Sequence, residues 1–321
     1  MNLLKLEQDF DNIRKVSYDL DLINRESKRS INKLVSVSEK MYYDQMHQAC
    51  KLIAESKPKV ILLSGPSASG KTTTAEILRS ELGNKYNIGS VVVSLDDFFL
   101  NPEDSPVLPD GSPDLENLLK LDLLEINKFV ENIMTKGEAT KPTFDFASGR
   151  RSSKTDLVTV KDNDVVIIEG IHALNPALIQ NQNFLSRVFK VYVCTNSNFF
   201  LFDELVISDK TLRMMRRLLR DYLKRGEKID SFLQKWPNVL VGEEKYIIPF
   251  KTQADVVIDS VHMYEPLVYA KYLKTMLESY MAESINPNLW LKKMLYALRQ
   301  AEEVDKSVIP QDSMLWEVLL R

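Results

Sequence analysis

The sequence has few of the residues that build disulfide frameworks and zinc sites. Two of its 321 residues are cysteines, Cys50 and Cys194, three are histidines, and no C-x-x-C spacing occurs. Disulfide-stabilised secreted domains and structural zinc modules need denser clusters of these residues. We therefore expect neither a disulfide nor a structural zinc, and a chain that works in a reducing cytoplasm.

Long apolar runs and a dominant charge are also missing. No segment approaches the roughly 18 apolar residues of a membrane-spanning helix, and the first residues, "MNLLKLEQDFDNIRK", mix acids and bases as no secretory signal does. The formal net charge of -3 argues against a protein whose whole surface binds nucleic acid. With 44% apolar and 27% charged residues, the composition is that of a soluble globular protein. We expect no membrane and no nucleic-acid partner.

Strand-like and helix-like segments alternate through the middle of the chain. Apolar runs typical of buried strands cover residues 59–63, 90–95, 164–170, 188–193 and 254–260. Amphipathic segments of helical length include residues 75–82, 115–134 and 211–224. This alternation predicts an α/β fold with a doubly wound, mainly parallel sheet over residues 58–261. The proline-rich segment 101–113 is expected to be a long surface loop.

The two flanking regions have helical patterns. Residues 1–57 predict two helices separated near "NRESKRS", and residues 262–321 predict further helices, one of which starts at "NPNLW" near residue 287. We interpret these regions as an N-terminal and a C-terminal helical extension. The apolar positions of the N-terminal pattern are Leu3, Leu4, Phe10 and Ile13 in the first helix and Leu34, Val35, Met41, Tyr42 and Met46 in the second.

The segment "SGPSASGKTTT" follows the first predicted strand. It matches the pattern G-x-x-x-x-G-K-[ST] and lies between a strand and a helix, as a phosphate-binding loop must. In such a loop the backbone N–H groups face a nucleotide's phosphates, the lysine ammonium lies between the β- and γ-phosphates, and the hydroxyl after the lysine holds magnesium. The candidate nucleotide contacts are Gly65, Ser67, Ala68, Ser69, Gly70, Lys71, Thr72 and Thr73.

Acidic residues end the second and third predicted strands. Glu169 closes "VVIIE", the position at which an acid orients magnesium in a phosphate-loop protein, and a capping or salt-bridged glutamate is the alternative. "SLDDFF" brings Asp96 and Asp97 to the same edge of a parallel sheet as the phosphate loop. A carboxylate there can accept the proton of an acceptor hydroxyl or hold a metal-bound water. Turn formation or helix capping is the alternative for either aspartate.

A basic helix and an aromatic loop complete the candidate site. Asp209 to Lys228 has arginines at helical spacing, which predict a lid that stabilises charge on a transferred phosphoryl group; a solvated helix face and a nucleic-acid contact are the alternatives. "KPTFDFASGRR" is either a hairpin tip with its aromatics in the core or a loop that stacks on a planar base. The basic face of the helix comprises Arg213, Arg216, Arg217, Arg220 and Lys224, and the loop candidates are Phe144, Asp145 and Arg151.

Two large classes of phosphate-loop protein lack support. The N-K-x-D motif that reads guanine in GTPases and the L-S-G-G-Q signature of ABC-type ATPases are both absent from the sequence. The remaining signals, namely the phosphate loop, the two strand-end acids and the arginine-rich helix, describe a kinase that acts on a small molecule.

In this order and spacing, the motifs resemble those of the phosphoribulokinase and uridine kinase family. The resemblance covers residues 58–260 and rests on "GPSASGKTT", "SLDDFF", "FDF", "VVIIEGIHALNP", "RRLLRDYLKRG" and "EEKYIIPFKTQAD". The likeness is closest to the uridine kinase-like module of bacterial proteins that also carry TGS and threonyl-tRNA-synthetase-like domains. A tRNA-related role that those other domains suggest does not carry over to this chain. The resemblance implies a nucleoside kinase-like fold with ATP as donor, magnesium, a nucleoside acceptor and room for a homo-oligomer.

The family's functional residues carry over to particular positions. The resemblance implies Asp96 as catalytic base and magnesium contact, Lys71 and Thr72 as phosphate and metal contacts, and Glu169 as the magnesium-site acid. Arg216 and Arg217 match catalytic lid arginines, and Arg213 matches an acceptor-side arginine. Asp97 stands where relatives often have serine and is not assigned the role of base.

The acceptor side departs from the family pattern. Phe144 stands where uridine-cytidine kinases usually have tyrosine, and Gly149 where they have a histidine. The ribose-binding aspartate is either Asp110 or Asp114 of "PDGSPD". The expected function is transfer of the γ-phosphate of ATP to the 5′-hydroxyl of a nucleoside. The alternatives are a kinase for another hydroxyl acceptor, such as a sugar phosphate or a pantothenate-like molecule, and a nucleotide-binding regulator without catalysis.

Overall fold

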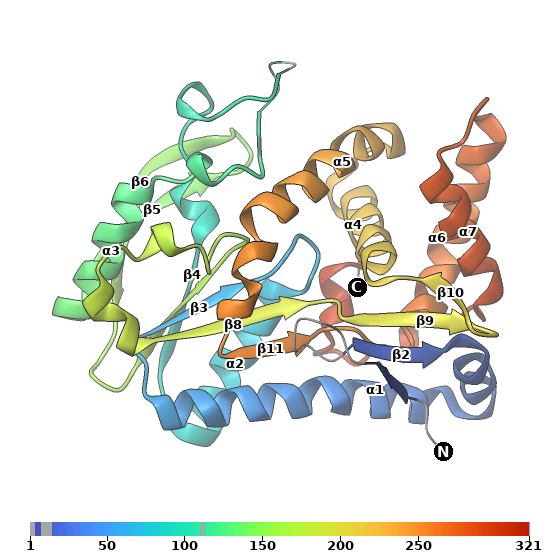
Figure 1. Cartoon of the computed structure of the whole chain (residues 1–321), viewed down its shortest axis with the longest axis horizontal. Coiled ribbons are helices and arrows are strands. Elements are labelled where there is room, and N and C mark those ends of the chain that lie inside the picture. The colour runs from blue at the N-terminus through green and yellow to red at the C-terminus, as the bar shows by residue number, and fades with distance from the viewer. Residues whose placement is uncertain (1–3, 8–14, 110, 112, 321) are drawn as a thin grey trace.

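A five-stranded sheet forms the centre of the molecule (Figure 1). The computed structural model describes residues 4–7, 15–109, 111 and 113–320. Every pairing in the sheet is parallel, and the strand order is β11 (Val256–Asp259), β8 (Val188–Cys194), β3 (Val60–Ser64), β7 (Val165–Glu169) and β4 (Ser90–Ser94). All five strands coincide with predicted segments, so the doubly wound α/β fold is confirmed.

Successive side chains of each central strand pack alternately into two separate hydrophobic cores. In β3, Ile61 and Leu63 belong to the core cluster that contains the apolar side chains of α1 (Leu20–Ser56) and α2 (Lys71–Tyr86). Val60 and Leu62 belong to the other cluster, together with α3 (Leu123–Lys136). Side chains alternate between the faces of a strand, so both faces of the sheet are covered, as parallel sheets require.

The remaining helices lie in the second half of the chain. They are α4 (Asp209–Arg225), α5 (Ile229–Tyr246), α6 (Glu265–Glu283) and α7 (Leu289–Gln300). The predicted start of α7 is confirmed, since the Asn288 side chain caps it by accepting from Trp290 N at 2.8 Å. α3 begins later than predicted because Asp122 caps it through Glu125 N at 3.0 Å. None of the described helices has the length and apolar character to cross a membrane.

The first of the two predicted N-terminal helices is wrong. The described part of this segment forms two strands, β1 (Leu4–Glu7) and β2 (Lys15–Asp19), whereas Leu3, Phe10 and Ile13 lie outside the described residues. β2 pairs in parallel with β9 (Ser197–Leu201), which pairs in turn with β10 (Glu204–Ile207). Tyr18 packs on Phe199 with ring centroids 5.3 Å apart. Pairing with a distant strand overrides the weak helical pattern of this short segment.

The second predicted helix is present as the long helix α1, with a kink at Ser30 where the sequence predicted a break. Tyr42 and Met46 are fully buried and belong to the same core cluster as strand residues of the sheet and apolar residues of α6 and α7. Glu39 of α1 bonds His262 at 3.1 Å and Tyr264 at 2.5 Å, just beyond β11. Both flanking regions therefore pack into the core that supports the central sheet.

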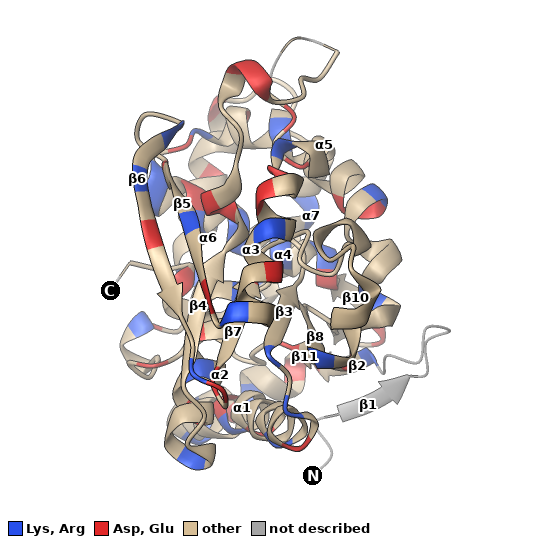
Figure 2. Cartoon of the chain, turned by 90° about the vertical axis from the view of Figure 1, so that its left-hand side faces the viewer, with Lys and Arg blue, Asp and Glu red and all other residues tan. Residues whose placement is uncertain are grey.

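An antiparallel hairpin lies at the opposite end of the molecule from α6 and α7 (Figure 1). It consists of β5 (Glu138–Asp145) and β6 (Arg150–Thr159), and it carries charges of both signs (Figure 2). The hairpin follows α3 in the chain and packs against it. It borders the carboxyl end of β4, at the sheet edge where ligands bind in open α/β folds.

Candidate active site

The phosphate loop joins β3 to α2 in a conformation that only its glycines permit. A Cβ atom on Gly65 would lie 2.0 Å from the carbonyl oxygen of Val193 on the neighbouring strand. Gly70 caps α2 with φ 91°, a value that side chains rarely adopt. Lys71 is buried, and its Nζ donates to the carbonyl oxygen of Pro66 at 3.1 Å. The buried hydroxyl of Ser69 has no partner among the described residues, which fits a loop that wraps a ligand's phosphates.

Lys71, Asp96 and Glu169 come together at the carboxyl ends of the central strands. Burial raises the pKa of both the Asp96 and the Glu169 carboxyl, although the nearby Lys71 ammonium lowers each of them. The charge of Asp96 raises the pKa of Glu169 further. Glu169 Oε1 also accepts a hydrogen bond from the Ser94 hydroxyl at 3.0 Å. The strand-end acids and the phosphate loop thus share one sheet edge, as the parallel sheet predicts.

This group of oxygens fits a magnesium ion. Burial raises the pKa of both carboxyls and the charge of Asp96 raises that of Glu169 further, so a divalent cation would stabilise both carboxylates, and Mg²⁺ prefers oxygen ligands. Thr72, the hydroxyl that follows the loop lysine, is exposed at the start of α2. Thr72, Asp96 and Glu169 are the residues that would hold the ion, directly or through water.

Asp97 has a different role from its neighbour. Its Oδ2 accepts a hydrogen bond from Lys141 Nζ of β5 at 2.8 Å, and the same ammonium lies 3.1 Å from Asp156 of β6. Asp97 thereby fastens the hairpin to the sheet edge. Asp96, rather than Asp97, remains the candidate base.

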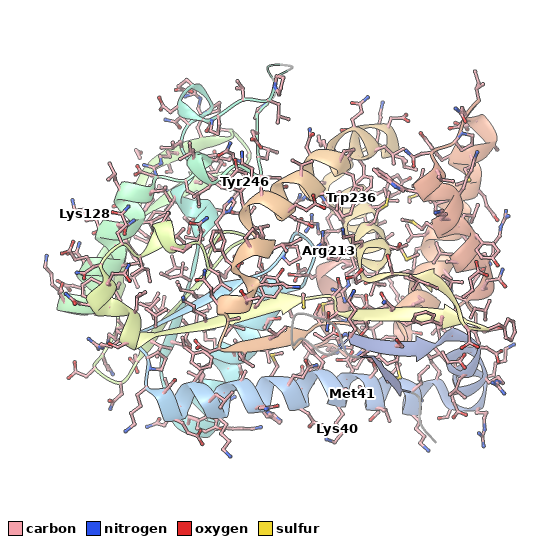
Figure 3. The ribbon with its side chains drawn as sticks, in the orientation of Figure 1. Lys40, Met41, Lys128, Arg213, Trp236 and Tyr246 are labelled. Atoms are coloured by element: carbon pink, nitrogen blue, oxygen red, sulfur yellow. The ribbon has the colours of Figure 1, made fainter. Side chains whose placement is uncertain are left out.

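The arginines of α4 do not form one exposed basic face. Arg216 is fully buried, where its Nε and Nη2 donate to Glu265 of α6 at 2.8 and 2.5 Å. Its Nη1 donates to the Ala68 carbonyl of the phosphate loop at 3.3 Å. A two-point ion pair therefore occupies this guanidinium and makes Arg216 a support of the phosphate loop, while its assignment as a catalytic lid arginine stays a prediction. Arg213 is buried as well and pairs with Glu243 of α5 beside Trp236 (Figure 3).

The other arginines of α4 surround a single buried carboxylate. Asp221 lies 3.4 Å from Arg217, 2.9 Å from Arg220 and 3.2 Å from Arg225. Burial lowers the pKa of Lys71, and the positive charge of Arg220 lowers it further by a smaller amount. The sequence pointed to Arg217 and Arg220 but missed Arg225, which lies off the face that helical spacing defines. These three arginines are the remaining candidates for lid cations.

Two predicted acceptor-site residues hold the hairpin instead. Arg151 donates to the Phe99 carbonyl at 2.7 Å and pairs with Glu125 of α3 at 2.8 Å. Asp145 is exposed at the hairpin turn, where it accepts from Ala147 N at 2.9 Å and Ser148 Oγ at 2.7 Å. These contacts give both side chains a structural role, and their assignment as substrate-binding residues stays a prediction.

The hairpin tip carries a group of aromatic rings, and the hairpin interpretation is confirmed. Phe144 packs edge-on between Phe99 and Phe146, with ring centroids 5.5 and 5.3 Å away. Phe146 is 66% exposed, so the expectation that both aromatics lie in the core is wrong. The exposed ring leaves a face on which a planar group can stack.

The segment between the second strand and α3 supplies further candidates. Asp110 lies outside the described residues, and Asp114 accepts a hydrogen bond from Asn117 at 3.0 Å. Sequence reasoning missed Glu116, which is buried 3.6 Å from Arg217 and whose pKa is raised by burial. His172, which follows β7, lies outside this segment; burial lowers its pKa to about 4, and its ring packs edge-on against Tyr246 at the end of α5.

Residues from both flanking regions contact the first turns of α2, and sequence reasoning missed them all. The Tyr42 hydroxyl of α1 bonds Thr74 at 2.7 Å, and Thr73 donates to Glu317 near the end of the chain at 2.9 Å. A Cβ atom on Gly70 would lie 3.0 Å from Met314 Sδ. No local motif marks such residues, because only the fold brings them to the loop.

Comparisons with known proteins place this arrangement in a family. The family model described as Phosphoribulokinase / Uridine kinase matches residues 60–265. The chain is similar to a uridine kinase of Geobacillus kaustophilus, with 28% identity over 204 residues that make up 63% of this chain and 86% of the relative. It is also similar to a uridine kinase of Staphylococcus aureus, with 30% identity over 62% of this chain and 86% of the relative. A solved possible uridine kinase of Bacillus stearothermophilus shares 22% identity and a TM-score of 0.45 over 68% of this chain and 98% of that one.

The matched residues include the phosphate loop, both strand-end acids and the arginine-rich helix, and extend from β3 to the start of α6. The chain therefore belongs to the phosphoribulokinase and uridine kinase family, whose members are phosphate-loop phosphotransferases that act on a hydroxyl acceptor.

Proposed function

We propose that the protein is an ATP-dependent nucleoside kinase that transfers the γ-phosphate of ATP to the 5′-hydroxyl of a nucleoside in the cytoplasm. One observation carries this proposal: Asp96 lies at the sheet edge beside Lys71 and Glu169, and burial raises its pKa. A carboxylate with a raised pKa is a stronger base than one in water, so it is suited to take a proton from an alcohol.

The chain's own residues account for the steps of transfer. Asp96 accepts the proton of the acceptor hydroxyl while that oxygen forms its bond to the γ-phosphorus and the bond to the bridging oxygen of ADP breaks. Lys71 stabilises the negative charge that moves toward the β-phosphate, and Arg217 stabilises the transferred group. Bound Mg²⁺ supplies further neutralisation of the phosphate oxygens.

The aromatic rings at the hairpin tip support a nucleoside as acceptor. Phe144 and the exposed Phe146 offer apolar faces near the segment that follows Asp96. Stacking on an aromatic ring holds any nucleobase, because every base has a π-face. Phe144 lacks the hydroxyl of a tyrosine and Gly149 has no side chain, so hydrogen-bonded reading of a particular base is not favoured at these positions. We infer a nucleoside kinase with broad base tolerance.

A second candidate function is a kinase for a phosphorylated sugar. A cavity of about 190 Å³ lies beside Pro66 of the phosphate loop, and its charged lining residues are the bases Lys15, Lys210, Arg213 and Lys251 and the acids Asp209 and Glu243, with the bases in excess. The Nε of Arg213 is buried there without a hydrogen-bond partner among the described residues. Basic side chains that line a small cavity favour an anionic group such as a phosphate.

An acceptor panel tests the two functions. ADP formation is measured with Mg²⁺ and ATP, and then with GTP, in the presence of purine nucleosides, pyrimidine nucleosides, ribose phosphates and pantothenate. The nucleoside proposal predicts turnover with several nucleosides and none with ribose phosphates. Turnover only with a phosphorylated sugar would establish the second candidate, and ATP binding without any turnover would indicate a regulator.

A further inference from the structure

The end of the chain lies against the phosphate loop. Met314–Glu317 form a short helical turn below α4 (Figure 1), and Met314 packs on Gly70. Glu317 Oε2 accepts a hydrogen bond from the Thr73 hydroxyl at 2.9 Å. This segment lies outside residues 60–265, so the family match says nothing about it. It is a feature of this chain's own C-terminal region.

The contacts hold the segment in a defined position. Lys224 of α4 donates to the carbonyl oxygens of Trp316 and Glu317 at 2.6 and 2.8 Å, and Tyr43 of α1 donates to Asp312 at 2.9 Å. Met314 and Leu315 are buried to 1% and 0% exposure. The segment therefore connects the lid helix, the long N-terminal helix and the first turn of α2.

The chemistry of Glu317 conflicts with a bound nucleotide. Thr73 is the third residue of α2, within the first turn whose N–H groups favour an anion. Glu317 places a carboxylate against that turn. Burial lowers the pKa of Lys71 and the charge of Glu317 opposes this lowering, whereas burial raises the pKa of Glu169 and the charge of Glu317 adds to this rise. Phosphates brought to the same turn experience repulsion from this carboxylate and compete with it for the Thr73 hydroxyl.

We propose that the C-terminal segment, residues 310–320, is an intrachain inhibitor of nucleotide binding, in which the Glu317 carboxylate competes with the phosphates of ATP for the first turn of α2. Nucleotide binds fully only when the segment shifts. The apparent affinity for ATP therefore equals the intrinsic affinity multiplied by the fraction of molecules in which the segment is displaced. Because Lys224 of the lid helix holds the same segment, lid movement and release of the inhibitor are coupled.

Calorimetric titration with ATP, in the absence of any acceptor, tests the proposal. Glu317→Gln keeps the shape and a hydrogen-bond acceptor for Thr73 and removes only the charge. We expect it to bind ATP about ten-fold more tightly at low salt, with a gain that shrinks as ionic strength rises. Adenosine, which has no phosphate, should bind both proteins equally.

Two further variants separate charge from general loosening. Glu303→Gln removes the same charge from an ion pair with Lys274 at 2.6 Å, elsewhere in the C-terminal region, and should bind ATP as the wild type does. Tyr43→Phe weakens the hold on Asp312 without changing charge and should tighten ATP binding about two-fold.

Equal or weaker ATP binding by Glu317→Gln would overturn the proposal, and weaker binding would make Glu317 part of the nucleotide site. The outcome of the ATP titration is independent of the proposed nucleoside activity, because that titration contains no acceptor and adenosine is titrated separately. Tighter ATP binding without turnover in the acceptor panel would uphold the inhibitor and reject the nucleoside kinase. Failure of ATP to bind any of these proteins would overturn the inhibitor as well.

Discussion

The donor side and the acceptor side of the candidate site are built differently. On the donor side, the phosphate loop is covered by residues from both ends of the chain, through Tyr42 on Thr74 and Met314 on Gly70. On the acceptor side, the hairpin and the preceding segment leave large apolar side chains at the surface, with Phe146 66% and Leu119 61% exposed.

The difference follows from what each side has to do. Phosphoryl transfer depends on fixed charges in fixed places, so the loop and its lysine need rigid support. Acceptor selection depends on loops, which vary without disturbing the core. The donor side is therefore the part where substitutions should affect catalysis and folding most, and the acceptor side the part where they should affect affinity.

Asp96→Asn should have the largest effect. Loss of the base is expected to lower kcat about 10²- to 10⁴-fold, while ATP affinity stays within a few-fold of the wild type. Steady-state kinetics with the best acceptor from the panel, together with ATP titration, measure both quantities. Retained turnover in this variant would show that Asp96 is not the base.

Arg216 and Arg217 are adjacent but should respond in opposite ways. Arg216→Met leaves Glu265 buried and unpaired, so the free energy of unfolding should fall by about 3 to 5 kcal/mol. Arg217→Met leaves Asp221 with two other arginine partners, Arg220 and Arg225, so it should cost only about 1 to 2 kcal/mol of stability and lower kcat at least about ten-fold. Urea unfolding and kinetics of the two variants provide the comparison. Equal stability losses would contradict the division of the arginines into buried support and lid.

Glu169→Gln should change the pH dependence of stability. Because burial raises the pKa of Glu169 in the folded chain, the folded state holds a proton that the unfolded state has already released. The stability of the wild type should therefore fall as the pH rises from the pKa of Glu169 in the unfolded chain, about 4.3, to its raised pKa in the folded chain. At pH 7 the variant should be about 1 kcal/mol more stable, and at pH 4 the two should agree. A wild type that is the more stable protein at pH 7 would reverse this sign.

Phe146→Ala should have the smallest effect and act only on the acceptor side. Loss of the exposed ring is expected to raise the KM for a nucleoside about three- to ten-fold without changing kcat or the KM for ATP. Phe202→Ala removes another exposed phenylalanine, 84% exposed between β9 and β10, and serves as the matched control. Equal effects of both substitutions would argue against a role of the hairpin tip in acceptor binding.

Local patterns explain what was predictable. The central strands are continuous apolar runs, and the phosphate loop needs Gly65 and Gly70 for steric reasons that act within a few ångströms. A parallel arrangement of those strands is enough to place Asp96 and Glu169 at the loop's edge of the sheet. The N-terminal helix prediction failed where the signal was weakest, because the short strand β2 is fixed by β9, which lies far away in the sequence.

The sheet, the phosphate loop and the acids that end its strands follow from the sequence alone, because apolar runs and glycine sterics are properties of neighbouring residues. Which arginines of α4 are buried depends on the packing of distant elements, since Glu265, the partner of Arg216, lies 49 positions away. The same is true of the contact between Thr73 and Glu317, which are 244 positions apart. Contacts between charges that are distant in the sequence depend on how whole helices and strands pack together, and the spacing of residues within one segment does not predict that packing.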